Sequence, residues 1–251
     1  MPEWLRRFRT HALFLAGVAA AWETGVAQGW LDPMFFGSPR GVAVFLWQQL
    51  SGADGLWRDV GWTLASTLLS FVLGATLAVL AGLAFVALPR AERFARPYLA
   101  ALNAIPRIAL APLFILWFGL GLASKVAIGT SIVFFIVLGS TVAGVRGASA
   151  DLVTLARVYG ASPSAILFRV VLPGAVPTIF AGLRLGLLFA MLGVVGSEII
   201  ASEHGLGQRL AYLGATFHVD GVLAILAILS AIGVGLTEGM SWIERRMLAW
   251  Q

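Results

Sequence analysis

The chain alternates between long, continuously apolar stretches and short polar segments that hold most of its charges. A bilayer core about 30 Å thick needs roughly 20 apolar residues in helical form. Six stretches approach that length, at approximately 11–30, 61–88, 98–120, 124–145, 181–201 and 222–242. Barrel strands are about ten residues long and alternate in polarity, so the pattern favours helices. We therefore expect an all-α integral membrane protein with about six transmembrane helices.

The composition supports a lipid environment. Of the 251 residues, 59% are hydrophobic and 12% charged, whereas a soluble domain carries about a quarter of its residues as charges. The net charge of +5 could indicate nucleic acid, but the arginines lie beside apolar stretches, so no such partner is expected. Cysteine is absent, which excludes disulfides and thiol chemistry. Three scattered histidines lack the spacing of metal ligands, so we expect no metal site.

The distribution of Lys and Arg predicts that both termini are cytoplasmic. With the N-terminus inside, inner segments hold twelve of these residues and outer segments four, which is the bias of the positive-inside rule. Arg6, Arg7 and Arg9 followed by an apolar run also fit a cleavable secretory signal. An uncleaved anchor preserves the charge asymmetry and is the interpretation we adopt. Between the first two spans, the apolar run 42–50 is too short to cross and predicts an interfacial helix on the outer face.

The polar segment 147–180 predicts two short helices outside the bilayer. Apolar residues recur there at helical spacing, a glycine ends the first helix, and prolines begin and end the second. These residues are Leu152, Leu155, Ala156, Tyr159, Gly160, Pro163, Pro173 and Pro177. Such a protruding plug suits a groove on a partner protein. An amphipathic helix lying on the inner leaflet fits the same pattern, and physical reasoning alone leaves both open.

Segment 147–180 resembles the cytoplasmic loop of ABC importer permeases, whose pattern is Glu-Ala-Ala, three residues, Gly, nine residues, then Ile-x-Leu-Pro. Here Gly160 is followed after nine residues by Val170-Val171-Leu172-Pro173, and Ala156 matches the last alanine. Further motifs look like the nitrate, sulfonate and taurine branch of these permeases. They are Asn103-Ala104-Ile105-Pro106, 111–119, 181–186 and Gly205-Leu206-Gly207. The resemblance covers about residue 61 to the C-terminus and implies a type I ABC importer permease fold.

The resemblance also implies an assembly. Residues 1–251 would form a single transmembrane permease domain of the bacterial inner membrane, multi-pass, with 147–180 as its coupling loop. The implied partners are a second copy of the chain, two cytoplasmic ATPase subunits and an extracytoplasmic substrate-binding protein. By resemblance, the coupling element is marked by Ala156, Gly160, Leu172 and Pro173. No phosphate-cradling Walker loop is present, so we expect no catalytic residue or cofactor in this chain, with ATP and Mg bound by the partner ATPase.

Charged residues at membrane depth need partners or water, which makes them candidates for function. Arg107 follows Pro106, and a proline-broken helix could let Arg107 and Asn103 line a pathway for an anion. Arg107 could instead snorkel to the inner face. Ser197 and Glu198, near the outer end of a span, either contact substrate or bond backbone and water.

One further pair is expected to be structural. Arg184 and Glu238 fall near the cytoplasmic ends of adjacent predicted spans, which predicts a structural ion pair.

The sequence thus predicts the permease subunit of an ATP-driven importer for a small, anionic solute of the sulfonate, taurine or nitrate kind. The alternative is a secondary transporter driven by an ion gradient, with Glu198 or Glu23 as its proton site. The importer requires an ATPase and an intact inner loop, whereas the carrier requires an intramembrane carboxylate. A membrane enzyme has little support, because no span presents clustered catalytic groups.

Overall fold

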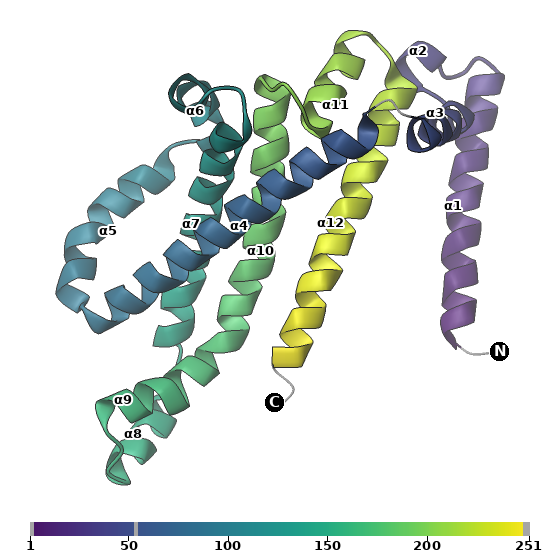
Figure 1. Ribbon diagram of the computed structural model, residues 1–251. Helices are drawn as coiled ribbons and strands as arrows, with labels where there is room; N and C mark the ends of the chain where they lie inside the picture. Colours follow the sequence, from purple (N-terminus) through teal and green to yellow (C-terminus); the bar gives the residue numbers. More distant parts are fainter. Residues whose placement is uncertain (1–2, 53–54, 248–251) are drawn as a thin grey trace.

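The computed structural model describes residues 3–52 and 55–247, and in these residues every regular element is a helix (Figure 1). The elements are α1 (Glu3–Ala27), α2 (Pro33–Phe36), α3 (Pro39–Ser51), α4 (Leu56–Ala87), α5 (Pro89–Ala104), the 3-10 turn η1 (Arg107–Leu110), α6 (Ala111–Phe118), α7 (Leu122–Arg146), α8 (Ala150–Val158), α9 (Pro163–Ile166), the π-helical turn η2 (Leu167–Val171), α10 (Leu172–Ile200), α11 (Leu206–Ala215) and α12 (Val219–Met247).

Four helices are long and apolar enough to cross a membrane, or five if a bent pair counts as one span. The four are 56–87, 122–146, 163–200 and 219–247, and the bent pair is 89–104 with 107–118. The all-α membrane architecture predicted from the sequence is therefore confirmed. The first predicted span forms α1, whose 25 residues extend about 37 Å. Its apolar run lies between Arg9 and Glu23, so it falls short of the other spans in hydropathy, and its crossing stays a prediction.

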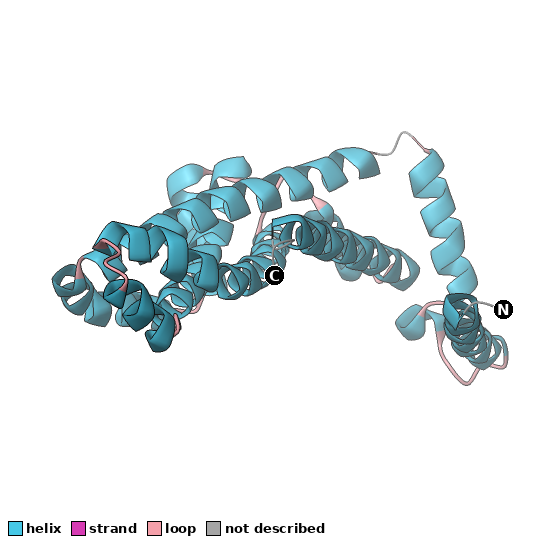
Figure 2. Ribbon diagram, turned by 90° about the horizontal axis from the view of Figure 1, so that it is seen from below, coloured by secondary structure: helices cyan, strands magenta, loops and turns pink. Residues whose placement is uncertain are grey.

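Helix α1 stands at the edge of the bundle, beside α2 and α3 (Figures 1 and 2). The predicted interfacial helix is present as α3, which runs crosswise to α1 and α12. Its N-cap Ser38 accepts a hydrogen bond from the Gly41 amide (2.9 Å), and Asp220 of α12 accepts one from the Ser38 amide (2.6 Å). A Cβ at Gly41 would lie 2.0 Å from Asp220 Oδ2, so glycine is required where α3 meets α12.

The centre of the bundle is the packing of α4 against α7 and of α7 against α10. Small residues recur on α4 at every fourth position, at 66, 70, 74, 78 and 82, and all five are buried. A Cβ at Gly74 would lie 2.7 Å from Val133 Cβ, and one at Gly82 would lie 2.6 Å from Thr141 Cγ2. The two hydroxyls of this row are satisfied within α4, since Ser66 donates to the Trp62 carbonyl and Ser70 to the Ser66 carbonyl (both 2.7 Å). Close approach of this kind is how helices associate in lipid, where apolar burial gives no driving force.

The lipid-facing side of α4 shows the opposite chemistry. Leu69, Leu73, Leu77 and Leu80 are 43–61% exposed and run along one side of the helix. A soluble helix would place polar residues there. The exposed leucines therefore fit a helix whose outside meets hydrocarbon.

The predicted span 98–120 is two helical segments that begin earlier in the chain. Helix α5 begins at Pro89, and the pair α5 and η1–α6 is bent by 83° at the break before Arg107. Pro106 cannot donate a backbone hydrogen bond, and Ile105 is extended, so the helix cannot continue. Arg107 thus lies about 27 Å along the helix path from Pro89. This position argues against snorkelling to the end where α5 begins.

The inner loop is partly as predicted. Helix α8 ends before Gly160, whose φ of 79° is the left-handed conformation that glycine adopts freely, and a second helix begins at Pro163. The prediction that Pro173 and Pro177 end this helix is wrong, because it continues to Ile200 as one span of 38 residues. In the π-helical turn just before Pro173, the Leu172 amide bonds the Leu167 carbonyl, and this wider turn accommodates a residue without an N–H. The predicted span 181–201 therefore begins within the predicted loop.

Helices α8 and α9 protrude beyond the ends of α4 and α7, at the end of the bundle where α1 begins and α12 ends (Figure 1). We call this the α8 end and the opposite one the far end.

Candidate functional site

A groove runs between α5 and α7 from the middle of the bundle to the α8 end. It consists of two adjoining cavities of about 480 and 420 Å³ that share Asn103 and Phe135. Along α7 it extends from Ile132 to Arg146, which is about 21 Å of helix. We call it the α5–α7 groove. The cavity of about 480 Å³ lies toward the middle of the bundle and is called the upper cavity; the one of about 420 Å³ at the α8 end is the lower cavity. The upper cavity is lined by Asn103, Pro106, Arg107, Ile108, Ile132, Phe135, Ile136 and Phe189.

The groove follows from how polar residues are spaced on α5. Glu92, Arg96, Leu99 and Asn103 are separated by four, three and four residues, so they share one face of the helix. No residue of α5 is buried, and this helix lies apart from α7 along most of its length. A charged helix face therefore borders a cavity instead of a packed core.

Arg107 is the innermost charge in the groove. Its guanidinium lies over the Phe135 ring, 4.2 Å from the ring centroid, at the middle of α7. Its Nη2 is buried and has no hydrogen-bond partner within the described part of the chain. A cation–π contact is favourable, but a buried donor without a partner is costly. The arrangement leaves the N–H groups of Nη2 available for an anion or for water.

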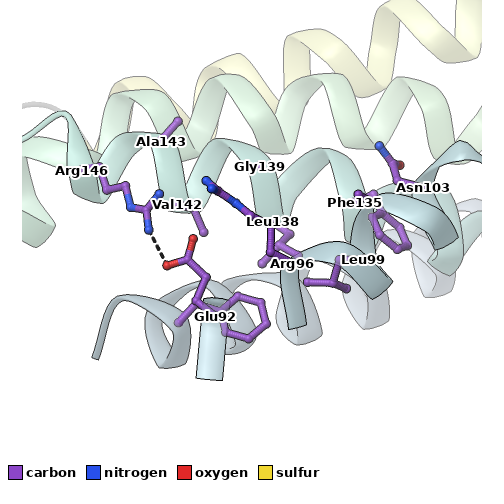
Figure 3. Close-up of a pocket in the computed structure, with 12 residues that line it drawn as sticks. Glu92, Arg96, Leu99, Asn103, Phe135, Leu138, Gly139, Val142, Ala143 and Arg146 are labelled. Atoms are coloured by element: carbon purple, nitrogen blue, oxygen red, sulfur yellow. Dashed lines mark hydrogen bonds and ion pairs between the residues drawn. The ribbon is translucent and has the colours of Figure 1, made fainter. Parts of the chain in front are cut away.

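The lower cavity is shown in Figure 3 and adds three charged residues. Glu92 and Arg146 form an ion pair at the α8 end; the side chain of Glu92 is 12% exposed and that of Arg146 50%. Each charge also suits its helix end, because Glu92 lies in the first turn of α5 and Arg146 in the last turn of α7. Arg96 points toward α7 between this pair and Asn103, and it has no ion-pair partner among the described residues.

Asn103 and Arg107 therefore lie together, whereas Ser197 and Glu198 lie elsewhere. Ser197 Oγ donates to the Val194 carbonyl of its own helix (2.7 Å). Glu198 is 1% exposed and lines neither cavity of the groove. Its carboxylate accepts hydrogen bonds from Thr63 Oγ1 (2.9 Å) and the Gly207 amide (3.0 Å), and it pairs with Lys125 Nζ at 3.2 Å. The structure thus gives Glu198 a structural environment instead of a place in the groove.

These contacts belong to a larger network at the far end. Lys125 also donates to the His204 carbonyl, and Thr63 accepts from the Leu206 amide at 2.9 Å. Asp59 accepts from the Gly205 amide (3.0 Å) and from Arg209 Nε (2.8 Å). We call this network the Glu198 clamp; it consists of Asp59, Thr63, Lys125, Glu198 and the loop 204–209.

The glycines of the Gly205-Leu206-Gly207 motif are explained by the clamp. A Cβ at Gly205 would lie 2.1 Å from Glu198 Oε1, and one at Gly207 would lie 2.5 Å from the Val195 carbonyl oxygen. Only glycine therefore allows the loop to close over the carboxylate. The motif that resembles a transporter family in the sequence is a packing requirement in the structure.

Arg184 forms an ion pair with α12 as predicted, but the predicted partner, Glu238, is wrong. Arg184 Nη2 instead pairs with Glu244, near the end of α12. Leu236, Met240 and Glu244 recur at every fourth position and share the face of α12 that meets α10. Glu238 lies about 200° around the helix from Leu236 and is exposed.

The four predicted coupling residues lie on different parts of the inner loop. Ala156 is half-buried on α8 and Gly160 forms the turn after it, while Leu172 and Pro173 border a cavity of about 560 Å³ at the base of α10. Beside Ala156 and Gly160, large apolar side chains point to solvent. They are Leu152, Leu155, Val158 and Tyr159, which are 53–82% exposed. We call these four residues the tip patch.

The described residues contain no group of three His, Asp or Glu side chains that could hold a metal ion. Arg107 and Asn103 were identified from the sequence, whereas Arg96 and Arg146 were counted only as inner positive charges. The signal for the groove was available in the spacing of Glu92, Arg96 and Asn103 on one face of α5.

Residues 71–249 match the family described as "Binding-protein-dependent transport system inner membrane component". The chain is 34% identical over 230 residues to the riboflavin transport system permease protein RibX of Chloroflexus aurantiacus, covering 92% of this chain and 85% of the relative. It is 30% identical over 241 residues to the taurine transport system permease protein TauC of Escherichia coli K12, covering 94% and 87%.

A solved structure of the MetNI methionine ABC transporter in an inward-facing conformation shares the fold. Its TM-score is 0.67 at 20% identity, with 78% of this chain and 98% of that chain covered. The helical arrangement described above is thus that of a type I importer permease fold. The chain is a member of the family of binding-protein-dependent transport system inner membrane components and is the permease subunit of an ABC importer.

Proposed function

We propose that this chain forms the translocation pathway for a small anionic solute along the α5–α7 groove. The observation that carries the proposal is Arg107, whose buried Nη2 has no hydrogen-bond partner in the described chain and faces the groove at the middle of α7. A cation held in this way at membrane depth needs an anion or water. Asn103, which borders both cavities, adds an amide that can donate to the same solute.

The rest of the groove favours an anion as well. Arg96, Arg107 and Arg146 outnumber the single carboxylate of Glu92 along its length. One relative is named for taurine, which carries a sulfonate, and another for riboflavin. The names therefore span different solutes, and the anion assignment rests on the three arginines.

The proposed assembly contains two copies of this chain as one permease domain each, two cytoplasmic ATPase subunits that bind ATP and Mg, and an extracytoplasmic binding protein. The start of α1, the end of α12 and the protruding α8 and α9 lie at one end of the bundle (Figure 1). Together with the twelve basic residues counted for that side, this supports cytoplasmic termini. The tip patch then faces the cytoplasm, where exposed Val158 and Tyr159 suit an apolar groove on the ATPase.

The secondary-transporter alternative receives less support. Glu198 is enclosed in the clamp, and Glu23 accepts a hydrogen bond from the Arg40 amide at 3.2 Å. Neither carboxylate borders the α5–α7 groove. A proton carrier would need one of them on the transport route.

Replacing Val158 and Tyr159 together with serine is expected to lower recovery of the ATPase with the tagged permease at least tenfold. Loss of a buried aromatic anchor from an interface costs about 2 kcal/mol or more, and 1.4 kcal/mol is tenfold in affinity. The measurement is quantification of co-purified ATPase from native membranes. Tyr212→Ser is the matched control, because Tyr212 is 63% exposed at the far end.

Equal recovery of the ATPase with the tip variant and with the control would show that the tip patch does not bind the ATPase. Absence of ATPase from the wild type, in detergent that preserves a complete transporter, would contradict the proposed assembly.

Arg107→Gln is expected to reduce uptake of labelled taurine about tenfold in proteoliposomes that contain the assembled transporter, and Arg107→Lys is expected to retain part of it. The glutamine removes the charge but keeps a donor, and a hydrogen bond to a charged group contributes about 1.5–3 kcal/mol. Arg90→Gln is the control, since Arg90 is exposed at the start of α5 and borders neither cavity. Wild-type uptake by Arg107→Gln would place the anion route outside the groove.

A further inference from the structure

The lower cavity of the α5–α7 groove contains one more arginine than its ion pair accounts for. Within about 420 Å³ it brings together two arginines and one glutamate, and the cavity wall is otherwise mostly apolar (Figure 3). Arg96 has no ion-pair partner among the described residues, and half of the Arg146 side chain is exposed. The net charge of the three is +1. The cavity is therefore a place where a small anion gains from two guanidinium groups.

The contact of Glu92 with Arg146 shows how the carboxylate of such an anion would bind. The Glu92 carboxylate contacts Arg146 Nη2 and is itself largely enclosed, with 12% of its side chain exposed. A carboxylate held by a guanidinium is chemically similar to a carboxylate, sulfonate or phosphate ligand in the same place. Glu92 thus acts as an internal anion for Arg146.

The same ion pair is also a connection between helices. Among the described residues, it is the one ion pair or side-chain hydrogen bond that joins α5 to another helix. Leu99 packs half-buried against the core near α7, but no residue of α5 is fully buried, so the ion pair is the main contact of the first turn of α5. Displacement of Glu92 from Arg146 would therefore free both the anion site and the lower part of α5.

We propose that Arg96 and Arg146 form a second oxyanion-binding site at the α8 end of the groove, and that the Glu92 carboxylate occupies the Arg146 side of this site until a small oxyanion displaces it. The site rests on the proposed function for its ligand, since the oxyanion would be the solute leaving the pathway. A solute that passes Arg107 meets Arg96 and then Arg146 along the same groove. Competition with Glu92 keeps the site weak, which permits release.

The test is equilibrium binding of radiolabelled sulfate to the full chain in phosphatidylcholine nanodiscs. Glu92→Gln is expected to bind sulfate about tenfold more tightly than the wild type, because the competing carboxylate is gone and Arg146 is released. Adding Arg96→Gln or Arg146→Gln to this variant is expected to return binding to the wild-type level or below. Glu203→Gln makes the same chemical change at an exposed site on another segment and is expected to leave binding unchanged.

If the Glu92–Arg146 pair is only structural, Glu92→Gln is expected to leave sulfate affinity unchanged or to lower it. Unchanged or weaker sulfate binding by Glu92→Gln overturns the proposal, as does a gain that persists when Arg96 and Arg146 are both glutamine. A cooperative thermal unfolding transition in each sample shows that the variant is folded, and a rise of its midpoint on addition of sulfate reports binding to the native state. The measurement needs neither ATPase nor transport, so its failure is distinguishable from failure of the proposed anion pathway, which the uptake assay of Arg107→Gln tests.

The phosphate of an inner-leaflet lipid presents the same chemistry as a free oxyanion. Repeating the Glu92→Gln measurement in nanodiscs that contain phosphatidylglycerol separates these sources. Tight sulfate binding that persists there supports a free solute as the ligand. Loss of sulfate binding in these discs alone assigns the site to lipid and overturns its role in solute release.

Discussion

Replacing Lys125 with methionine is expected to destabilise the protein by about 3–5 kcal/mol, because the Glu198 carboxylate then stays buried without its counterion. The side chains of this pair are 3% and 0% exposed, so water cannot replace the lost partner. Unfolding of the purified protein in mixed micelles, followed by its far-UV helical signal against denaturing detergent, measures the change. The Lys125 contact to the His204 carbonyl is lost in the same variant, which adds to the cost.

A double-mutant cycle separates the ion pair from its neighbours. Glu198→Gln is expected to destabilise strongly as well, while Lys125→Met combined with Glu198→Gln is expected to be more stable than the sum of the two changes predicts. A glutamine can still accept from Thr63 and the Gly207 amide, and no charge is left buried in the double variant. Strict additivity of the two single changes would show that the pair is not coupled.

The clamp determines where the far-end loop lies. Residues 204–209 are held through Lys125, Thr63, Glu198 and Asp59, which come from three different helices. Under the proposed orientation this loop faces the side from which a binding protein delivers solute. Loss of the clamp is therefore expected to affect docking there as well as stability.

The sequence predicts the spans well where a helix is unbroken and less well where prolines intervene. The predicted stretches 61–88, 124–145 and 222–242 correspond to α4, α7 and α12. The stretch 98–120 failed because an 83° break separates two segments that together begin at Pro89. The fifth predicted span, 181–201, lies within α10, but its start was placed too late, because a π-helical turn lets the helix continue through Pro173.

The candidate site was predictable only in part. Arg107 was found because a charge at membrane depth is costly and so is informative. Arg96 and Glu92 were missed because charges near a span end are ordinary, and only their shared helix face relates them to a cavity. The pairing of Lys125 with Glu198 was out of reach, because 73 residues separate them and only the packing of α7 against α10 brings them together.

The α4–α7 contact gives the second large effect. Gly74→Ala is expected to destabilise the protein by about 1–3 kcal/mol, which is typical of overpacking in a tight core. The new Cβ would lie 2.7 Å from Val133 Cβ and 2.9 Å from the Thr130 carbonyl oxygen, and neither atom can move without shifting α7. The same micelle unfolding titration measures the loss. Because α7 also forms one wall of the α5–α7 groove, a shift of this helix is expected to reach the candidate pathway.

Gly61→Ala is the matched control, since Gly61 lies on the same helix and a methyl group added there would meet nothing within 4 Å. There the alanine is expected to stabilise the helix by about 0.5–1 kcal/mol, because it restricts the unfolded chain more than glycine does. The two identical substitutions on one helix should therefore change stability in opposite directions. Stabilisation by both would mean that α4 and α7 can separate at little cost, and that the small residues at 66, 70, 74, 78 and 82 reflect helix composition and not close packing.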